Sequence, residues 1–172
     1  MASALLNRYG DPQKRNRVFV TACKPDLALH DFPRETHHKD DLSLSRLVTA
    51  TNALGGISRV DPTEGNGFAE LVLHDGSSVF IQNHCKDGTN KQADLEELKP
   101  HEPAHTVRRK ANIKHYEHDR TLTVREMALL QSFGYDFQFC GSQKQQVDGI
   151  GNAVPIKVAK AVALAIKDMY SV

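Results

Sequence analysis

Residues 120–166 decide how the rest of the chain is interpreted, and they read RTLTVREMALLQSFGYDFQFCGSQKQQVDGIGNAVPIKVAKAVALAI. Thr123 and Glu126 form a capping box, which satisfies two backbone amides at the start of a helix. Residues 145–155 carry two glycines and an asparagine, so we expect a loop there, and Pro155 is typical of the first turn of a new helix. That second helix is indicated by apolar residues at helical spacing: Val158, Ala161, Val162, Ala165, Ile166 and Met169.

Two parts of this stretch resemble the ninth and tenth motifs of the cytosine-C5 DNA methyltransferases. TLTVREMALLQSF, residues 121–133, is similar to that family's T-x-R-E-x-A-x-x-Q-x-F helix, and GIGNAVP, residues 149–155, to its I-G-N-A-V-P turn. Pattern alone favours only two amphipathic helices joined by a turn, but two unrelated matches in order are far more specific than a short motif. The resemblance implies that Asn152, Ala153 and Val154 border the cofactor S-adenosylmethionine.

A third match lies near the start of the chain. LLNRYGDPQKRNRVFV, residues 5–20, is similar to the family's eighth motif, L-N-A-x-x-Y-G-V-P-Q-x-R-x-R-V-F. The resemblance implies that Arg17 hydrogen-bonds a cytosine flipped out of the duplex, with Gln13 and Arg15 supporting it and the DNA backbone. A planar, permanently charged donor fork suits the acceptor-rich edge of a pyrimidine.

The same segment also allows a purely structural interpretation. Residues 18–21 are β-prone and apolar on both faces, which predicts a strand buried inside a sheet, next to a solvated cluster of lysine and arginine. Arg8 and Asp11 stand where the family usually has small or apolar residues.

The chain has 172 residues, 40% of them hydrophobic and 25% charged, which is typical of a globular chain that can bury a core. A net charge of +1 neither favours nor excludes nucleic acid, so any DNA-binding surface has to be local. Three widely spaced cysteines argue against a disulfide framework. We therefore expect an intracellular protein, nuclear if eukaryotic and otherwise cytoplasmic. We expect no membrane partner, because no apolar run reaches about 18 residues.

Residues 33–118 lie between the matching segments, where the family carries its variable target-recognition domain. AELVLHDGSSVFIQN, residues 69–83, predicts a β-hairpin that turns at Asp75 and Gly76. A short amphipathic helix that two glycines end is indicated by Leu44, Leu47, Val48, Leu54, Gly55 and Gly56. The DNA sequence that such a domain would recognise cannot be read from these residues.

TVRRKANIKHYEHDR, residues 106–120, is a strongly basic segment. A run like this is often only a solvated face. Because it precedes the ninth motif, where the family's chain lies along DNA, we prefer to interpret it as a phosphate-contacting segment. We expect DNA contacts from Arg108, Arg109, Lys110 and Lys114, and from Arg125 in the helix that follows.

Two histidine patterns resemble metal sites. HEPAH, residues 101–105, matches the zinc-protease pattern H-E-x-x-H, but Pro103 is incompatible with the helix that both ligands need. His84 and Cys85 have no second pair at zinc spacing, which favours a solvated or half-buried pair. We therefore expect no metal site.

The sequence lacks three features of the family. Methyl transfer to cytosine C5 needs a thiolate, which the family presents in a Pro-Cys pair, whereas Cys23, Cys85 and Cys140 follow Ala, His and Phe. There is also no Glu-Asn-Val tripeptide and no glycine-rich turn after a buried strand. We expect this chain alone to be inactive and to need a polypeptide that carries the N-terminal catalytic half.

The fold class that we expect is α/β: a C-terminal fragment of a methyltransferase fold that uses S-adenosylmethionine, with a small mixed α+β target-recognition domain. Residues 1–32 would supply a strand segment, 33–118 the recognition domain and 119–172 the returning helices. The function implied is that of a DNA (cytosine-5-)-methyltransferase portion with duplex DNA as partner. A non-catalytic DNA-binding or regulatory remnant, and a truncated gene model, stay open as alternatives.

One physical consequence concerns the last helix. A single strand of the sheet cannot cover the apolar stripe of this helix. Val158, Val162 and Ile166 should therefore leave roughly a few hundred Å² of apolar surface exposed, which is the size of an interaction site.

Overall fold

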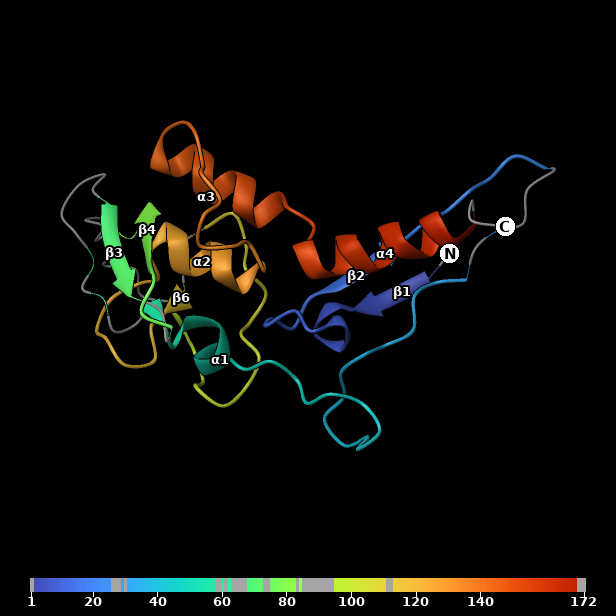
Figure 1. Cartoon of the computed structure of the whole chain (residues 1–172), viewed down its shortest axis with the longest axis horizontal. Coiled ribbons are helices and arrows are strands. Elements are labelled where there is room, and N and C mark those ends of the chain that lie inside the picture. Colours follow the sequence, from blue (N-terminus) through green and yellow to red (C-terminus); the bar gives the residue numbers. More distant parts are fainter. Residues whose placement is uncertain are drawn as a thin grey trace.

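The computed structural model describes residues 2–25, 29, 31–57, 60, 62, 68–72, 75–82, 84, 95–110 and 113–169. Its elements are β1 (Ala2–Leu5), η1 (Leu6–Tyr9), β2 (Asn16–Phe19), α1 (Ala50–Leu54), β3 (Phe68–Val72), β4 (Ser78–Gln82), β5 (Glu96–Glu97), β6 (Ile113–Lys114), α2 (Val124–Leu130), α3 (Gln143–Asn152) and α4 (Ile156–Met169). They form two groups (Figure 1): β1, β2, η1 and α4 lie together, and the hairpin β3–β4 lies at the outer edge of a second group that contains α1, α2, α3 and strand β6. Each group has its own apolar cluster.

The smaller group contains the predicted strand near Val18, but the burial of that strand was predicted wrongly. β2 pairs antiparallel with β1, and Ala4 lies opposite Arg17. Successive side chains of a strand point to opposite faces. Phe19 packs toward the cluster under η1, whereas Val18 is 61% exposed and Val20 is 72% exposed. The hairpin is therefore covered on one face only.

Helix α4 forms where the apolar spacing predicted it, directly after Pro155. Val158 is fully buried in the cluster with Leu6 of η1, and Val162 is half-buried, whereas Ile166 is 38% exposed. The prediction of an exposed stripe is thus wrong for Val158 and right for Ile166. The cover comes from η1 and β1, which the sequence did not indicate.

The larger group is built around the predicted hairpin. β3 and β4 pair antiparallel with Leu71 opposite Val79, and Gly76 occupies the turn with a φ of 80°, which confirms the prediction. Leu71 and Ile81 are buried in a cluster to which α1, α2 and α3 also contribute. β5 and β6 add a short parallel pair.

Helix α1 is shorter than predicted, whereas α2 begins as predicted. α1 begins after Thr49, whose side chain forms a capping box with Asn52, and residues 44–48 lie outside it. α2 begins after Thr123, which forms the expected capping box with Glu126. The competing cap at Thr49 explains the late start of α1, because it satisfies the backbone amides there.

Helix α3 occupies most of residues 145–155, where we expected a loop, so that prediction was wrong. Ser142 begins it with a third capping box, in which the side chain of Gln145 accepts from the amide of Ser142 at 2.8 Å. Val147 and Ile150 are buried on one face of α3. The cap and this packing outweigh the cost of two glycines in the helix.

The turn after α3 is short, and α3 and α4 meet at an angle of 44°. Within the described ranges no single helix is long and apolar enough to cross a membrane, and these two meet that criterion only as a bent pair, by length and composition.

Candidate functional site

An open cleft of about 540 Å³ lies where three distant segments meet. The segments are the start of β2 with the residue before it, the basic run after Ala104, and the end of α3. The cleft carries several positive charges and, among the residues that the structure describes, no acidic lining residue, which favours an anionic ligand. It is lined by Arg15, Arg17, Thr106, Val107, Arg108, Arg109, Lys110, Gly151 and Asn152.

Arg17 is the exposed arginine of the first segment. It lies in β2, and its Nη1 donates to the carbonyl of Asn16 at 2.7 Å. This bond is local, so the rest of the guanidinium fork faces the cleft and solvent. Arg17 can therefore present a planar pair of donors to a ligand in the cleft.

Gln13 lies beneath the cleft and is fully buried. Its Nε2 donates to the carbonyl of Leu130 and to Oε1 of Gln131, both at 2.9 Å, and its Oε1 accepts from the amide of Val107 at 3.0 Å. Gln131 in turn donates to the carbonyl of Ile150 at 2.6 Å. Gln13 thus connects α2 to the basic run directly, and it connects to α3 through Gln131. Because Gln13 is fully buried, it has no surface with which to touch a base.

Arg15 is also buried, and its guanidinium joins two walls of the cleft. Nη1 donates to the carbonyl of Val107 at 2.6 Å and Nη2 to the carbonyl of Gly151 at 2.9 Å. Burial, followed by the charge of Arg17, lowers the pKa of Arg15, which nevertheless stays charged. Arg15 therefore holds two walls of the cleft in position. Because both of these donors are occupied by the carbonyls, they are not placed to contact the DNA backbone.

Gly151 allows the closest approach in the site. A Cβ at this position would lie 2.5 Å from the carbonyl carbon of Arg108 and from the amide nitrogen of Arg109, a distance that real Cβ atoms do not show. Only glycine lets the end of α3 meet the basic run at this distance. Apart from the glycine itself, nothing in the sequence indicates this contact.

The residues expected to border the cofactor follow directly. Asn152 is exposed and lines the cleft, Ala153 is half-buried, and Val154 is 48% exposed outside the cleft lining. The amide of Ala153 donates to the carbonyl of Gly149 at 3.0 Å, which ends α3. An exposed amide side chain beside an exposed apolar one fits one edge of a ligand that, like S-adenosylmethionine, has polar and apolar parts.

The basic residues divide into two sets. Arg108, Arg109 and Lys110 lie on the rim of the cleft, where Arg108 is 3.8 Å from Glu96 and Arg109 is 3.3 Å from Asp148. Exposed ion pairs of this kind contribute little, so a phosphate can replace the carboxylate. Lys114 lies away from the cleft lining.

Arg125 is placed differently from our expectation of a DNA contact. It is fully buried, and its guanidinium donates to the carbonyls of Gln82 at 3.0 Å, Gly134 at 2.9 Å and Phe137 at 2.6 Å. The ring of Phe139 lies 5.3 Å from the guanidinium carbon. We correct the expectation, because a side chain enclosed in this way cannot reach a DNA phosphate.

The two histidine patterns are structural in the described residues. The segment 101–105 is not helical, and Ala104 instead exchanges backbone hydrogen bonds with Pro12 at 2.8 Å and Lys14 at 2.7 Å. His84 is fully buried, whereas we expected a solvated or half-buried side chain, and its Nε2 lies 2.7 Å from the carbonyl of Val60. Cys85 lies outside the described residues.

In its sequence, this chain is similar to DNA methyltransferases. The family model of the C-5 cytosine-specific DNA methylases matches residues 5–168. The type II methyltransferase M.AplI of Arthrospira platensis is 54% identical over 170 residues, which cover 92% of this chain and 44% of that protein. M1.HphI, a type II methyltransferase of Haemophilus parahaemolyticus, is 29% identical over 177 residues, which cover 94% of this chain and 45% of that protein. This chain thus spans less than half the length of these relatives.

The fold agrees with the sequence comparison. A prophage-encoded protein of E. coli, whose crystal structure is described as that of a DNA modification methyltransferase, superposes with a TM-score of 0.64 at 16% identity. The superposition covers 99% of this chain and 60% of that one. Because the family model extends over nearly the whole chain, this protein belongs to the C-5 cytosine-specific DNA methylases.

Proposed function

We propose that this chain forms the base-binding, DNA-facing and cofactor-bordering part of a DNA (cytosine-5-)-methyltransferase, which transfers a methyl group from S-adenosylmethionine to C5 of cytosine in duplex DNA. The observation that carries the proposal is that one cleft gathers Arg17, the basic residues 108–110 and Asn152. Arg17 and Asn152 come from segments that resemble the eighth and tenth motifs of the family, and residues 108–110 come from the basic segment that precedes the ninth. In this reading the chain carries the eighth, ninth and tenth motifs and the target-recognition region.

The roles follow from what each side chain can do. Arg17 holds the flipped cytosine by hydrogen bonds to its acceptor edge, while Arg108, Arg109 and Lys110 neutralise phosphates on either side. Arg15 acts beneath them by fixing the carbonyls of Val107 and Gly151 in place, and Gln13 by accepting from the amide of Val107, so the two side chains set the position of the basic run beside the end of α3.

S-adenosylmethionine, when bound, supplies an electrophilic methyl group. Asn152 offers an amide to its polar groups and Val154 an apolar contact, with Ala153 between them. These residues fit only one edge of the cofactor, so other residues must complete its site.

The nucleophile has to come from elsewhere too. Attack on C6 of cytosine needs a thiolate within reach of the base. Cys23 and Cys140 are exposed, and neither lines the cleft. We therefore propose that a further segment, in the same or a second polypeptide, provides the thiolate and the rest of the cofactor site, and that the 172-residue chain alone is inactive.

A complementation experiment tests this proposal. The chain is mixed with the part of the Arthrospira relative that it does not match, and methylation of duplex DNA is measured with labelled S-adenosylmethionine. We expect no methylation from either polypeptide alone and methylation from the mixture. Methylation by the pure chain would contradict the argument. A mixture that binds DNA but does not methylate it would favour the alternative that this chain is a non-catalytic DNA-binding or regulatory remnant.

A further inference from the structure

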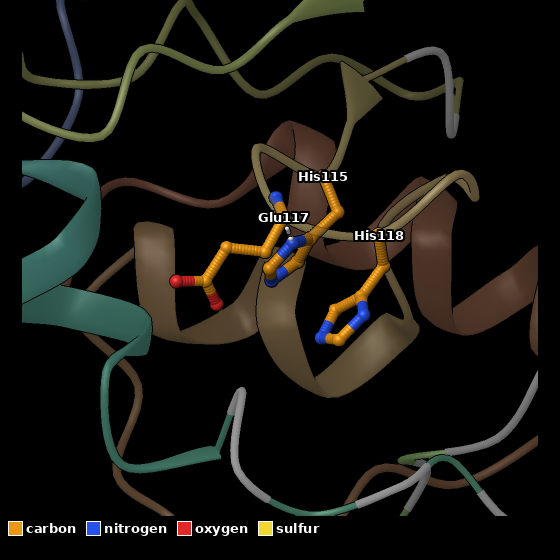
Figure 2. A group of neighbouring side chains, drawn as sticks. All are labelled: His115, Glu117 and His118. Atoms are coloured by element: carbon orange, nitrogen blue, oxygen red, sulfur yellow. Dashed lines mark hydrogen bonds between the residues drawn. The ribbon is translucent and has the colours of Figure 1, made fainter.

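The turn between β6 and α2 gathers three side chains of the kind that bind metal ions. Its backbone is closed by hydrogen bonds from the amide of His115 to the carbonyl of Arg120 at 2.9 Å and from the amide of Arg120 to the carbonyl of His118 at 2.8 Å. Figure 2 shows His115, Glu117 and His118 projecting from this turn. Each offers one ligand atom, and the three atoms lie within 4.8 Å of one another.

The surroundings of His115 suit an imidazole that ligates a cation. The ring of His115 is buried. The carboxylate of Glu126 lies 3.7 Å from its Nε2, and this nitrogen has no hydrogen-bond partner among the described residues. A ligating histidine usually donates from its second nitrogen to a carboxylate. If Nδ1 ligates the ion, Nε2 carries the proton and faces the carboxylate of Glu126. The ion then takes the place of the amide of Glu117, which donates to Nδ1 at 3.0 Å.

The other two side chains leave the cluster open on one side. Glu117 is exposed and His118 is half-buried, so an ion and its water can enter from solvent. Zinc bonds of about 2.0–2.2 Å hold tetrahedral ligand atoms roughly 3.4 Å apart. The exposed side chain of Glu117 and the half-buried His118 therefore have to turn inward by about 1 Å, which side-chain rotation allows.

Neighbouring cations do not oppose an ion at this place. Arg120 is held by both oxygens of Glu126, at 2.7 Å and 2.8 Å, and Lys114 pairs with Asp119 at 2.8 Å. Each positive charge next to the cluster is thus paired with a carboxylate, although Arg120 shares Glu126 with His115. The negative charge of Glu117 is left to balance a bound cation.

We propose that His115, Glu117 and His118 form a binding site for one divalent transition-metal ion of the zinc type, with water in the remaining position. Two imidazoles and one carboxylate suit zinc, cobalt or nickel and do not suit magnesium or calcium, which prefer oxygen ligands. The ion would fix the turn between the basic rim of the cleft and the capped start of α2. This site is separate from the cleft and does not depend on the methyltransferase proposal.

Metal titration of the full chain tests the site. Chelator-treated protein is titrated with Zn²⁺ against a chromophoric chelator, and Co²⁺ is used as a spectroscopic probe. We expect one ion per chain, a rise in the unfolding temperature on binding, and no competition from Mg²⁺. Glu117→Gln and His118→Ala should each weaken Zn²⁺ binding by at least about 100-fold, the upper end of the loss that follows when a residue that only orients a ligand is removed.

A matched control separates this cluster from other histidines. His105 is exposed and belongs to the HEPAH segment, so His105→Ala should leave the affinity unchanged. Glu117→Gln and His118→Ala change side chains that have solvent-exposed surface. Without metal, the unfolding temperatures of these variants should therefore match that of the metal-free parent. Equal affinity in parent and Glu117→Gln, an equal loss in His105→Ala, or a thiolate-to-cobalt charge-transfer band would each overturn the proposal.

Discussion

Nη2 of Arg15 donates to the carbonyl of Gly151 at 2.9 Å and so joins residues that are 136 positions apart in the chain. The same guanidinium holds the carbonyl of Val107 at 2.6 Å. One buried side chain therefore sets the distance between the end of α3 and the basic run, and with it the width of the cleft that contains Arg17.

Replacing Arg15 should destabilise the fold. Arg15→Ala leaves two buried carbonyls without donors, and each costs about 1–3 kcal/mol, so we expect the free energy of unfolding to fall by about 3 kcal/mol. Arg15→Lys should lose less than Arg15→Ala, because an ammonium can still donate to one of the two carbonyls, although it cannot span both as the planar fork does. Arg17→Ala, the control, should change stability by less than about 0.5 kcal/mol. Urea unfolding of the three variants measures this, and equal effects of Arg15→Ala and Arg17→Ala would disprove the positioning role.

Gly151 and Gly149 form a second matched pair. Gly151→Ala places a Cβ 2.5 Å from the backbone of Arg108 and should destabilise the chain by at least about 2 kcal/mol and weaken DNA binding, because the cleft wall must move. Gly149→Ala meets nothing within 4 Å and should stabilise α3 by about 0.5–1 kcal/mol. Thermal unfolding with a DNA-binding assay distinguishes them. Two substitutions with the same effect would mean that the close approach is not required.

The buried carboxyl of Asp11 should make stability depend on pH. It is fully buried and accepts a hydrogen bond from Ser132, and burial raises its pKa from 3.8 to about 7. Between these values the folded chain binds a proton that the unfolded chain has released, so stability falls as pH rises from about 4 to about 7. Asp11→Asn should remove most of this fall and should stabilise the chain at pH 8 by up to about 4 kcal/mol.

The measurement for Asp11 is urea unfolding of parent and Asp11→Asn at pH 5 and pH 8. At pH 5 the carboxyl is protonated in the folded chain but already ionised in the unfolded one, so the variant should be the more stable by only about 1.6 kcal/mol, less than half of the difference expected at pH 8. A constant difference at both values would show that Asp11 does not titrate in this range.

The rim of the cleft should determine how DNA binding responds to salt. If Arg108, Arg109 and Lys110 touch phosphates, each lost contact lowers the slope of log K against log salt concentration by about 0.9. Alanine at all three positions should therefore reduce the slope strongly, and Lys99→Ala, away from the cleft lining, should not change it. A slope that is the same for the triple variant and the parent would leave these residues as a solvated face.

The sequence predicted elements whose signals are local, and it missed those that depend on tertiary contacts. The capping box at Thr123, the turn at Gly76 and the apolar spacing after Pro155 each satisfy backbone groups or a face within a few residues, and all three were confirmed. β1 has no such signal. It forms because β2 pairs with it, and it then buries Val158, which we expected to be exposed.

The site shows the same division. The motifs and the basic run predicted separate roles for Arg17, Asn152 and residues 108–110, on the base, the cofactor and the phosphates, and the structure brings these residues to one cleft. The sequence could not show that Arg15 is buried beneath the cleft or that Arg125 is enclosed by three carbonyls. An arginine in a motif looks the same whether it faces a ligand or a carbonyl, and only burial distinguishes the two.

The most direct test of the central claim is the effect of Arg17→Ala in the complemented enzyme. Methylation rate at saturating DNA and the dissociation constant for duplex DNA are measured on the same preparation, with Arg109→Ala for comparison. If Arg17 holds the flipped cytosine, Arg17→Ala should lower the rate by about 100-fold or more and change the dissociation constant only a few-fold, whereas Arg109→Ala should mainly weaken DNA binding. Equal losses of rate and affinity in Arg17→Ala would contradict the account and reassign Arg17 to the phosphate backbone.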